Sequence, residues 1–219
     1  MAELKLIVGP RRFSTWSLRP WLVLKRAGAD FETVEIDFTT PEGHAELKAV
    51  SPSGLVPLLQ VDGETIWDSL AISEWAAERF PEARLWPADP TARALARSAT
   101  AEMHGGFIQL RTALTMNGGH LMVGDSRSEA PSHVAAEDDI RRLIGLWREM
   151  RERFGADGPW LFGDWSIADA FFTPVATRFR HYGVDLAALG DDGTAAAYAA
   201  TLLADADFRA WEAEALRNL

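Results

Sequence analysis

Two adjacent polar residues, Asp68 and Ser69, stand at the start of a predicted helix, where together they could bind the head of an amino acid. The first N–H groups of a helix are unpaired and carry partial positive charge, so they attract a carboxylate, and the Ser69 hydroxyl adds a donor. The Asp68 carboxylate could hold an ammonium group beside it. The commoner use of such a pair is a plain N-cap, in which the side chain satisfies the helix itself.

A second feature lies upstream in the stretch SGLVPLL (53–59), where Pro57 interrupts an apolar run that predicts a buried strand. Proline cannot donate to a sheet ladder, so it is confined to edge strands and strand starts. A cis-proline that begins a strand would leave the backbone of Val56 free to pair with a peptide-like ligand. A trans-proline on an edge strand is the simpler alternative, and the nearby Asp-Ser pair favours the ligand-binding interpretation.

The elements that must position these residues form a β-α-β unit followed by a β-hairpin and a helix. The β-α-β order implies a parallel pair, and Asp62-Gly63 marks the hairpin turn that adds antiparallel strands. We expect a small mixed four-stranded sheet with strands at 3–9, 31–37, 56–62 and 64–68, helices at 15–27 and 69–80, and a short helix or loop at 39–50.

The pattern changes after residue 80, where a proline-rich stretch predicts a linker and no further strand is recognisable. Apolar residues then recur at steps of three and four, which is the helical period. The predicted fold is an α/β N-terminal domain (1–80), a linker (81–90) and an all-α C-terminal domain (91–219). Its expected helices are a first long helix through Leu95–Leu114, one through Ile140–Phe154 and three at 166–180, 194–204 and 206–217, with a loop at 118–132.

Composition excludes several classes of function. The 219 residues carry a formal net charge of −10, which argues against a nucleic-acid surface because phosphates need basic patches. The chain has no cysteine, so disulfides, thiolate nucleophiles and Cys-x-x-Cys redox centres are impossible. No apolar segment approaches the ~20 residues that span a membrane, and the N-terminus lacks the pattern of a signal peptide. We expect a soluble cytoplasmic protein without nucleic-acid or membrane partners.

Taken together, these features resemble a cytosolic glutathione transferase. The resemblance rests on four segments, namely Val56-Pro57, Asp68–Ile72, FSTWSLRPWL (13–22) and GDWSIADAFFTPV (163–175). It implies that residues 1–80 form a thioredoxin-like domain, that Pro57 is cis and that the protein is a homodimer. It also implies glutathione as co-substrate, with the cysteinyl part paired to Val56 and the γ-glutamyl head held by Asp68 and Ser69.

The resemblance further implies that the enzyme stabilises the glutathione thiolate with a donor near a helix N-terminus, because an ordinary thiol has a pKa near ~8.5. Tyrosine occurs only at 182 and 198 and cysteine is absent, so the tyrosine and cysteine types are excluded and the serine type remains. Aligned without gaps with the theta and zeta classes, Ser14 matches the active serine, and Thr15 and Ser17 are alternatives. All three hydroxyls could instead cap the helix.

The second substrate is predicted to be a small electrophile. In the fold that the resemblance implies, the first long helix of the second domain walls the electrophile pocket, and His104, Phe107 and Arg111 share one face of it at spacings of three and four. Phe107 also fits the apolar core stripe. Trp16 stands where the zeta class has cysteine, which weighs against maleylacetoacetate isomerisation without excluding it.

The remaining motifs are interpreted as structural. Ser166 and Asp169 form an S-x-x-D capping box, and the histidines lack partners at metal-ligand spacing, so no metal is expected. Three functions stay open: glutathione conjugation, a zeta-like isomerisation, and non-catalytic binding of glutathione or a hydrophobic ligand by the same fold.

Overall fold

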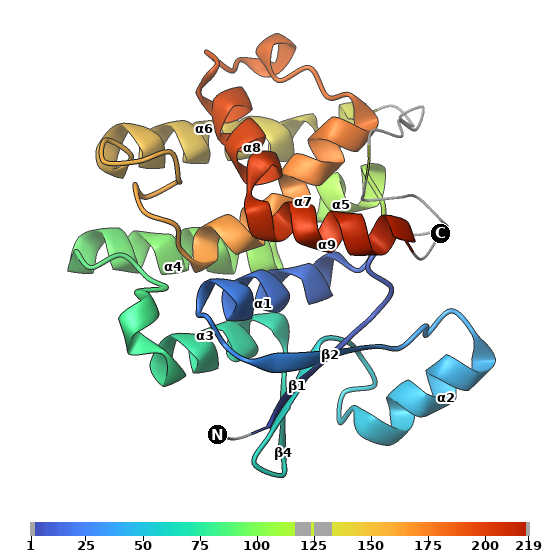
Figure 1. Ribbon diagram of the computed structural model, residues 1–219. Coiled ribbons are helices and arrows are strands. Elements are labelled where there is room, and N and C mark those ends of the chain that lie inside the picture. The colour runs from blue at the N-terminus through green and yellow to red at the C-terminus, as the bar shows by residue number, and fades with distance from the viewer. Residues whose placement is uncertain (1–2, 117–123, 125–132, 218–219) are drawn as a thin grey trace.

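The computed structural model describes residues 3–116, 124 and 133–217, and its N-terminal part is built on a mixed sheet (Figure 1). The strands lie in the order β2-β1-β3-β4, with β1 parallel to β2 and antiparallel to β3, and β3 antiparallel to β4. Their bounds are Leu4–Val8 for β1, Phe31–Glu35 for β2, Leu58–Val61 for β3 and Glu64–Trp67 for β4. The four strands expected from the sequence are confirmed.

Three helices cover this sheet, namely α1 (Thr15–Arg26), α2 (Pro41–Val50) and α3 (Ser69–Arg79). Alternate residues of β1 point to opposite faces, because side chains of a strand alternate with period two. Leu6 packs with α1 and α3 in the main core, whereas Ile7 joins Leu47 of α2 in a separate small cluster. Helix α2, which the sequence left open as helix or loop, is capped by Thr40.

The rest of the described chain is helical. A short 3₁₀ turn (Pro81–Ala83) begins the expected linker, and Pro90 at its end is already the first residue of α4. The α-helices are α4 (Pro90–Gly105), α5 (Ile108–Ala113), α6 (Glu137–Phe154), α7 (Ile167–Tyr182), α8 (Thr194–Ala204) and α9 (Ala206–Arg217). No described helix is long and apolar enough to cross a membrane. The loop expected at 118–132 lies outside the described residues except for Gly124.

The first long helix expected in the second domain is in fact two helices. It breaks after Gly105, because Gly106 adopts an extended conformation and Phe107 a left-handed one with φ of 55°. Adjacent glycines lower the cost of leaving the helix, since glycine is the poorest helix former after proline. The apolar period continues through the break, and for that reason the pattern predicted one continuous helix.

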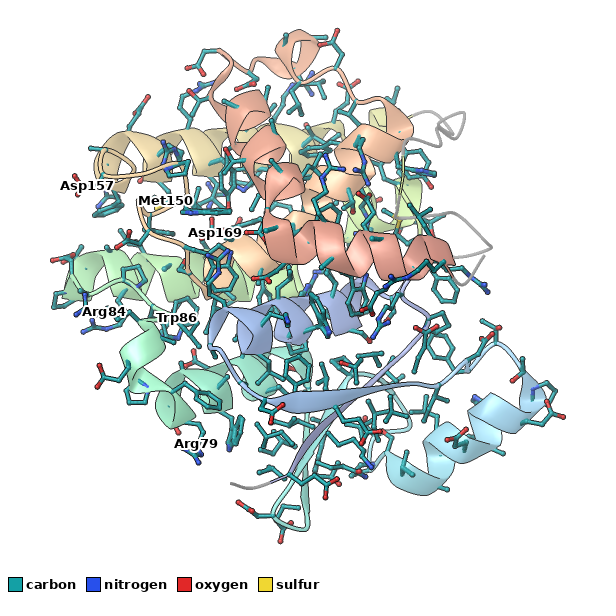
Figure 2. The ribbon with its side chains drawn as sticks, viewed as in Figure 1. Arg79, Arg84, Trp86, Met150, Asp157 and Asp169 are labelled. Carbon is teal, nitrogen blue, oxygen red and sulfur yellow. The ribbon has the colours of Figure 1, made fainter. Side chains whose placement is uncertain are left out.

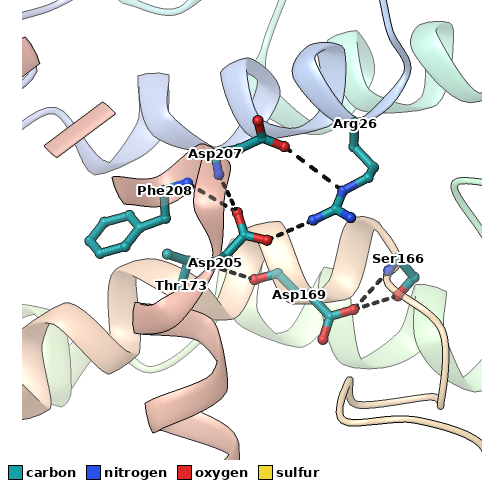
Figure 3. A network of polar contacts seen from close by, with 7 residues as sticks. All are labelled: Arg26, Ser166, Asp169, Thr173, Asp205, Asp207 and Phe208. Carbon is teal, nitrogen blue, oxygen red and sulfur yellow. Dashed lines mark hydrogen bonds and ion pairs between the residues drawn. The ribbon is translucent and has the colours of Figure 1, made fainter. Parts of the chain in front are cut away.

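The two domains meet where α1 packs against α7 and α9, as Figure 1 shows. In Figure 3, Arg26 at the end of α1 reaches Asp205, with 2.6 Å between Nη2 and Oδ2, and also faces Asp207. Asp205 in turn accepts the backbone N–H groups of Asp207 and Phe208 at the start of α9. The two domains are therefore held together both by aromatic packing, such as Trp21 on Trp211, and by charge.

The capping box before α7 is present and lies in the interior of the helical domain. Asp169 is fully buried and accepts hydrogen bonds from Ser166 N, Leu161 N and the Tyr198 hydroxyl. Figure 3 shows its contact with Ser166. Figure 2 shows Asp169 among these helices, whereas Arg79 at the end of α3 points away from them. Burial raises the pKa of Asp169 to about 6, against the opposing effect of its hydrogen-bond donors.

We expect Asp169→Asn to lower the free energy of unfolding by roughly 2–4 kcal/mol, because an amide group would set its own N–H donors against donors that are already buried. Urea denaturation followed by tryptophan fluorescence measures this change. Asp164→Asn is the matched control, since Asp164 is exposed on the same segment and its substitution should cost about 0.5 kcal/mol or less. Equal stability of the two variants would contradict the structural role of Asp169.

Candidate active site

A cavity of about 360 Å³ opens between the two domains beside the N-terminus of α1. The N-terminal domain contributes an apolar wall and the start of α1, and the helical domain contributes arginines. The principal lining residues are Phe13, Ser14, Thr15, Trp16, Phe38, Leu47, Leu55, Val56, Arg111, Met116 and Arg178. Of the predicted site residues, Ser14, Thr15, Val56 and Arg111 therefore line the cavity.

The three candidate hydroxyls before and within α1 occupy different environments. Ser14 is the N-cap residue of α1, and its Oγ donates to Ser17 Oγ at 2.8 Å. Ser17 Oγ also accepts the backbone N–H of Gly9 at 3.0 Å, and the residue is fully buried behind the cavity wall. Ser17 thus links α1 to the end of β1, while Ser14 and Thr15 line the cavity.

The Val56–Pro57 peptide bond is cis, and β3 begins at the next residue, Leu58. Val56 itself lies ahead of the strand and lines the cavity. Val56 and the candidate hydroxyl residues Ser14 and Thr15 therefore line the same cavity.

Asp68 and Ser69 lie at the start of α3, outside the residues that line this cavity. Asp68 is the N-cap, and its Oδ1 accepts the N–H groups of Leu70 at 2.7 Å and Ala71 at 3.4 Å. Ser69 is 1% exposed, and its Oγ has no hydrogen-bond partner among the described residues. Asp68 therefore has the capping role that the sequence offered as the commoner one, and the Ser69 hydroxyl keeps its hydrogen-bonding capacity.

The break between α4 and α5 separates the three residues expected on one helix face. Phe107 is 6% exposed, packs in the main core and does not line the cavity. Arg111 on α5 lines the cavity, and its guanidinium lies 4.8 Å from the centre of the Trp16 ring. His104 on α4 instead faces Asp68, with 3.2 Å between Nε2 and Oδ2. The predicted grouping on one helix face is therefore wrong, although Arg111 is on the cavity wall.

Two buried arginines near the cavity were not predicted as site residues. Arg19 of α1 lies between the rings of Trp16 and Phe171, at 4.2 and 4.8 Å from their centres. Arg178 of α7 lines the cavity and donates Nε–H to the Leu114 carbonyl at 2.9 Å. Burial lowers the pKa of Arg178 to about 10 and holds that of Arg19 well below its usual value. The sequence did contain an indication of both residues, because an arginine inside an apolar helical run is rarely buried unless it has a specific partner.

The electrostatics of the cavity are cationic in a protein that is acidic overall. Arg111 and Arg178 both reach its wall, and none of its described lining residues is acidic. Arg111 and Arg178 also repel the charge of Arg19 and so contribute to its lowered pKa, which Asp68 opposes. This arrangement can bind an anion, and among the described residues no cluster suited to a metal ion occurs.

Comparison with known proteins agrees with this geometry. Residues 13–79 match the family model of the glutathione S-transferase N-terminal domain. A probable maleylacetoacetate isomerase of Caenorhabditis elegans is 36% identical over 177 residues, which cover 80% of this chain and 78% of the relative. The maleylacetoacetate isomerase of Mus musculus is 40% identical over 180 residues, with the same two coverages of 80% and 78%.

Among solved structures, a glutathione transferase homolog from Burkholderia gl BGR1 with bound glutathione has a TM-score of 0.72 at 25% identity, covering 99% of this chain and 100% of that chain. The chain belongs to the glutathione transferase family. The family, the fold and the enzyme class expected from the sequence are thereby confirmed.

Proposed function

We propose that this enzyme activates the thiol of glutathione through the Ser14 hydroxyl and adds the thiolate to a small electrophile that carries a carboxylate. The observation that carries the proposal is the cavity itself, in which Ser14 and Val56 lie on one wall and Arg111 and Arg178 on the other. Glutathione as the ligand is supported by the family and by the similar structure that contains it.

Ser14 is suited to stabilise a thiolate because it stands at the N-cap position of α1, where the helix dipole favours negative charge. Its proton is directed at Ser17, and rotation about the Cβ–Oγ bond would turn it toward a sulfur in the cavity. Ser17 needs no proton from Ser14 to stay in place, because Gly9 N also holds it. Thr15, on the same wall, is the alternative donor.

The arginines support a carboxylate on the second substrate. A guanidinium binds a carboxylate through parallel N–H donors, and burial strengthens that interaction by excluding water. Phe13, Phe38 and Leu47 form an apolar wall beside them. An electrophile with an apolar reacting end and an acidic end therefore fits the cavity better than a neutral one.

A zeta-like isomerisation is a second candidate, favoured by the relatives named maleylacetoacetate isomerases. The thiolate would add to a carbon–carbon double bond, rotation would follow about the resulting single bond, and elimination would regenerate glutathione. Ser14 would stabilise the thiolate in this reaction too, and Arg111 and Arg178 would bind a carboxylate of the substrate. Trp16 in place of the zeta-class cysteine is the departure that keeps this candidate second.

Matched substrates test the proposal. The purified enzyme should conjugate glutathione to 4-chloro-3-nitrobenzoate with a higher kcat/KM than to its methyl ester, because only the acid can pair with the arginines. Arg111→Met should reduce kcat/KM for the acid by roughly 10-fold, the scale of a charged hydrogen bond, and affect the ester less. Retention on immobilised glutathione without turnover of any electrophile would instead support the binding-protein alternative.

A homodimer belongs to the same proposal, because the family resemblance implies it. Trp67 on the edge strand β4 is 48% exposed, which is unusual for a large apolar side chain and is consistent with a partner on that side.

A further inference from the structure

His104 connects the helical domain to the N-cap of α3. It lies in the last turn of α4, and its Nε2 is 3.2 Å from Asp68 Oδ2. The other carboxylate oxygen, Oδ1, already accepts the N–H groups of Leu70 and Ala71. The two oxygens of Asp68 are therefore contacted from two directions, Oδ1 by its own helix and Oδ2 by a residue of the other domain.

Neighbouring residues hold His104 in place. Its ring meets Trp16 edge-on, with 5.4 Å between ring centres, and lies 6.0 Å from the ring of Phe171. Its carbonyl accepts a hydrogen bond from Arg111 Nη2 at 3.0 Å. The imidazole is thus held by aromatic contacts and by its backbone, so that it can orient Asp68 rather than follow it.

Burial favours the neutral imidazole of His104 by lowering its pKa. The charge of Asp68 opposes that effect, and Arg19 and Arg111 add to it. At the 3.2 Å distance between His104 Nε2 and Asp68 Oδ2, a neutral imidazole that carries its proton on Nε2 can donate it to the carboxylate. It does not cancel the carboxylate's charge, as a lysine or arginine would. Asp68 remains 47% exposed at its side chain, so a cationic ligand can approach the carboxylate from outside the domain contact.

We propose that His104 is a positioning residue for the ammonium group of glutathione: its Nε2–H orients Asp68, whose negative charge then binds the γ-glutamyl ammonium. This inference rests on the proposed function, and it gives His104 a role at the glutathione end of the site in place of the expected contact with the electrophile. The ammonium can bind the lone pairs of Asp68 that neither the α3 backbone nor His104 uses.

A ligand cycle tests the inference. Isothermal titration calorimetry would measure the affinities of two ligands, glutathione and glutaryl-cysteinylglycine, an analogue without the ammonium. Each ligand would be titrated into the wild type, His104→Leu and His104→Gln. We expect His104→Leu to weaken the affinity for glutathione by about 3–10-fold, the scale of one hydrogen bond, and to leave kcat at saturating glutathione unchanged. His104→Gln keeps an N–H donor at similar reach and should bind within about 2-fold of the wild type. The analogue should bind equally to all three.

Thr100→Val is the matched control on the same helix, because it removes a buried hydroxyl that bonds only the Ala96 carbonyl and lies one turn before His104. It should leave the affinities of both ligands unchanged even if it lowers stability. Equal weakening of both ligands by His104→Leu, or no weakening of glutathione, would overturn the inference while leaving the proposed function intact. A wild type that binds no glutathione would overturn both.

Discussion

Replacing Ser14 by alanine should reduce kcat/KM for glutathione addition by roughly 10–1000-fold, the range observed when one donor to a developing anion is removed. Ser14 stands at the N-cap position of α1 and lines the cavity, so its hydroxyl and the helix dipole both favour thiolate over thiol. The pKa of the bound thiol should be below that of free glutathione in the wild type and closer to it in the variant. Thiolate absorbance in the near ultraviolet, followed against pH with bound glutathione, measures this shift directly.

Two neighbours provide the controls. Thr15→Val alters the other hydroxyl on the cavity wall, and Ser17→Ala removes the buried acceptor of Gly9 N. We expect Ser17→Ala to lower stability more than it alters the thiol pKa, because it leaves a buried backbone N–H without its partner. If Thr15→Val shifts the thiol titration more than Ser14→Ala does, the donor is Thr15, and the assignment of Ser14 fails.

The local elements of this chain were predictable where one pattern dominated. The sheet followed from β-forming runs and the Asp62-Gly63 turn, and helices α8 and α9 have the predicted bounds. The capping box of Ser166 and Asp169 was also visible, since both residues belong to one local motif. Each of these features is fixed by residues close in sequence.

The parts that escaped prediction depend on contacts between distant segments. The break after Gly105 lies inside an unbroken apolar period, and the chain turns there through the extended Gly106 and the left-handed Phe107. Arg178 reaches the cavity wall from α7 because α7 of the helical domain packs against α1 of the N-terminal domain. No local sequence pattern specifies that packing. The contact between His104 and Asp68 likewise joins two domains. Sequence patterns pointed to the hydroxyls, the strand-start proline and Arg111, but not to Arg178, the second arginine of the cavity wall.

Neutralising Asp68 should weaken glutathione binding by roughly 10-fold, the scale of a hydrogen bond between charged groups, while kcat at saturating glutathione changes little. The carboxylate has two functions that different substitutions separate, because asparagine is as good an N-cap as aspartate but carries no charge. Asp68→Asn should therefore keep the stability of the wild type and lose affinity. Asp68→Ala should lose affinity and also about 0.5–2 kcal/mol of stability, the usual cost of a missing cap.

Titration calorimetry and denaturant unfolding of both variants distinguish these effects. Because Asp68 is half-exposed, its attraction for an ammonium is screened by salt, so the difference between the wild type and Asp68→Asn should shrink as ionic strength rises. A matched carboxylate on α3 itself is Glu74, which pairs with Arg97 of α4. Glu74→Gln should leave glutathione affinity unchanged at every salt concentration. Unaltered affinity in Asp68→Asn would remove this carboxylate from the glutathione site and leave it as the N-cap of α3.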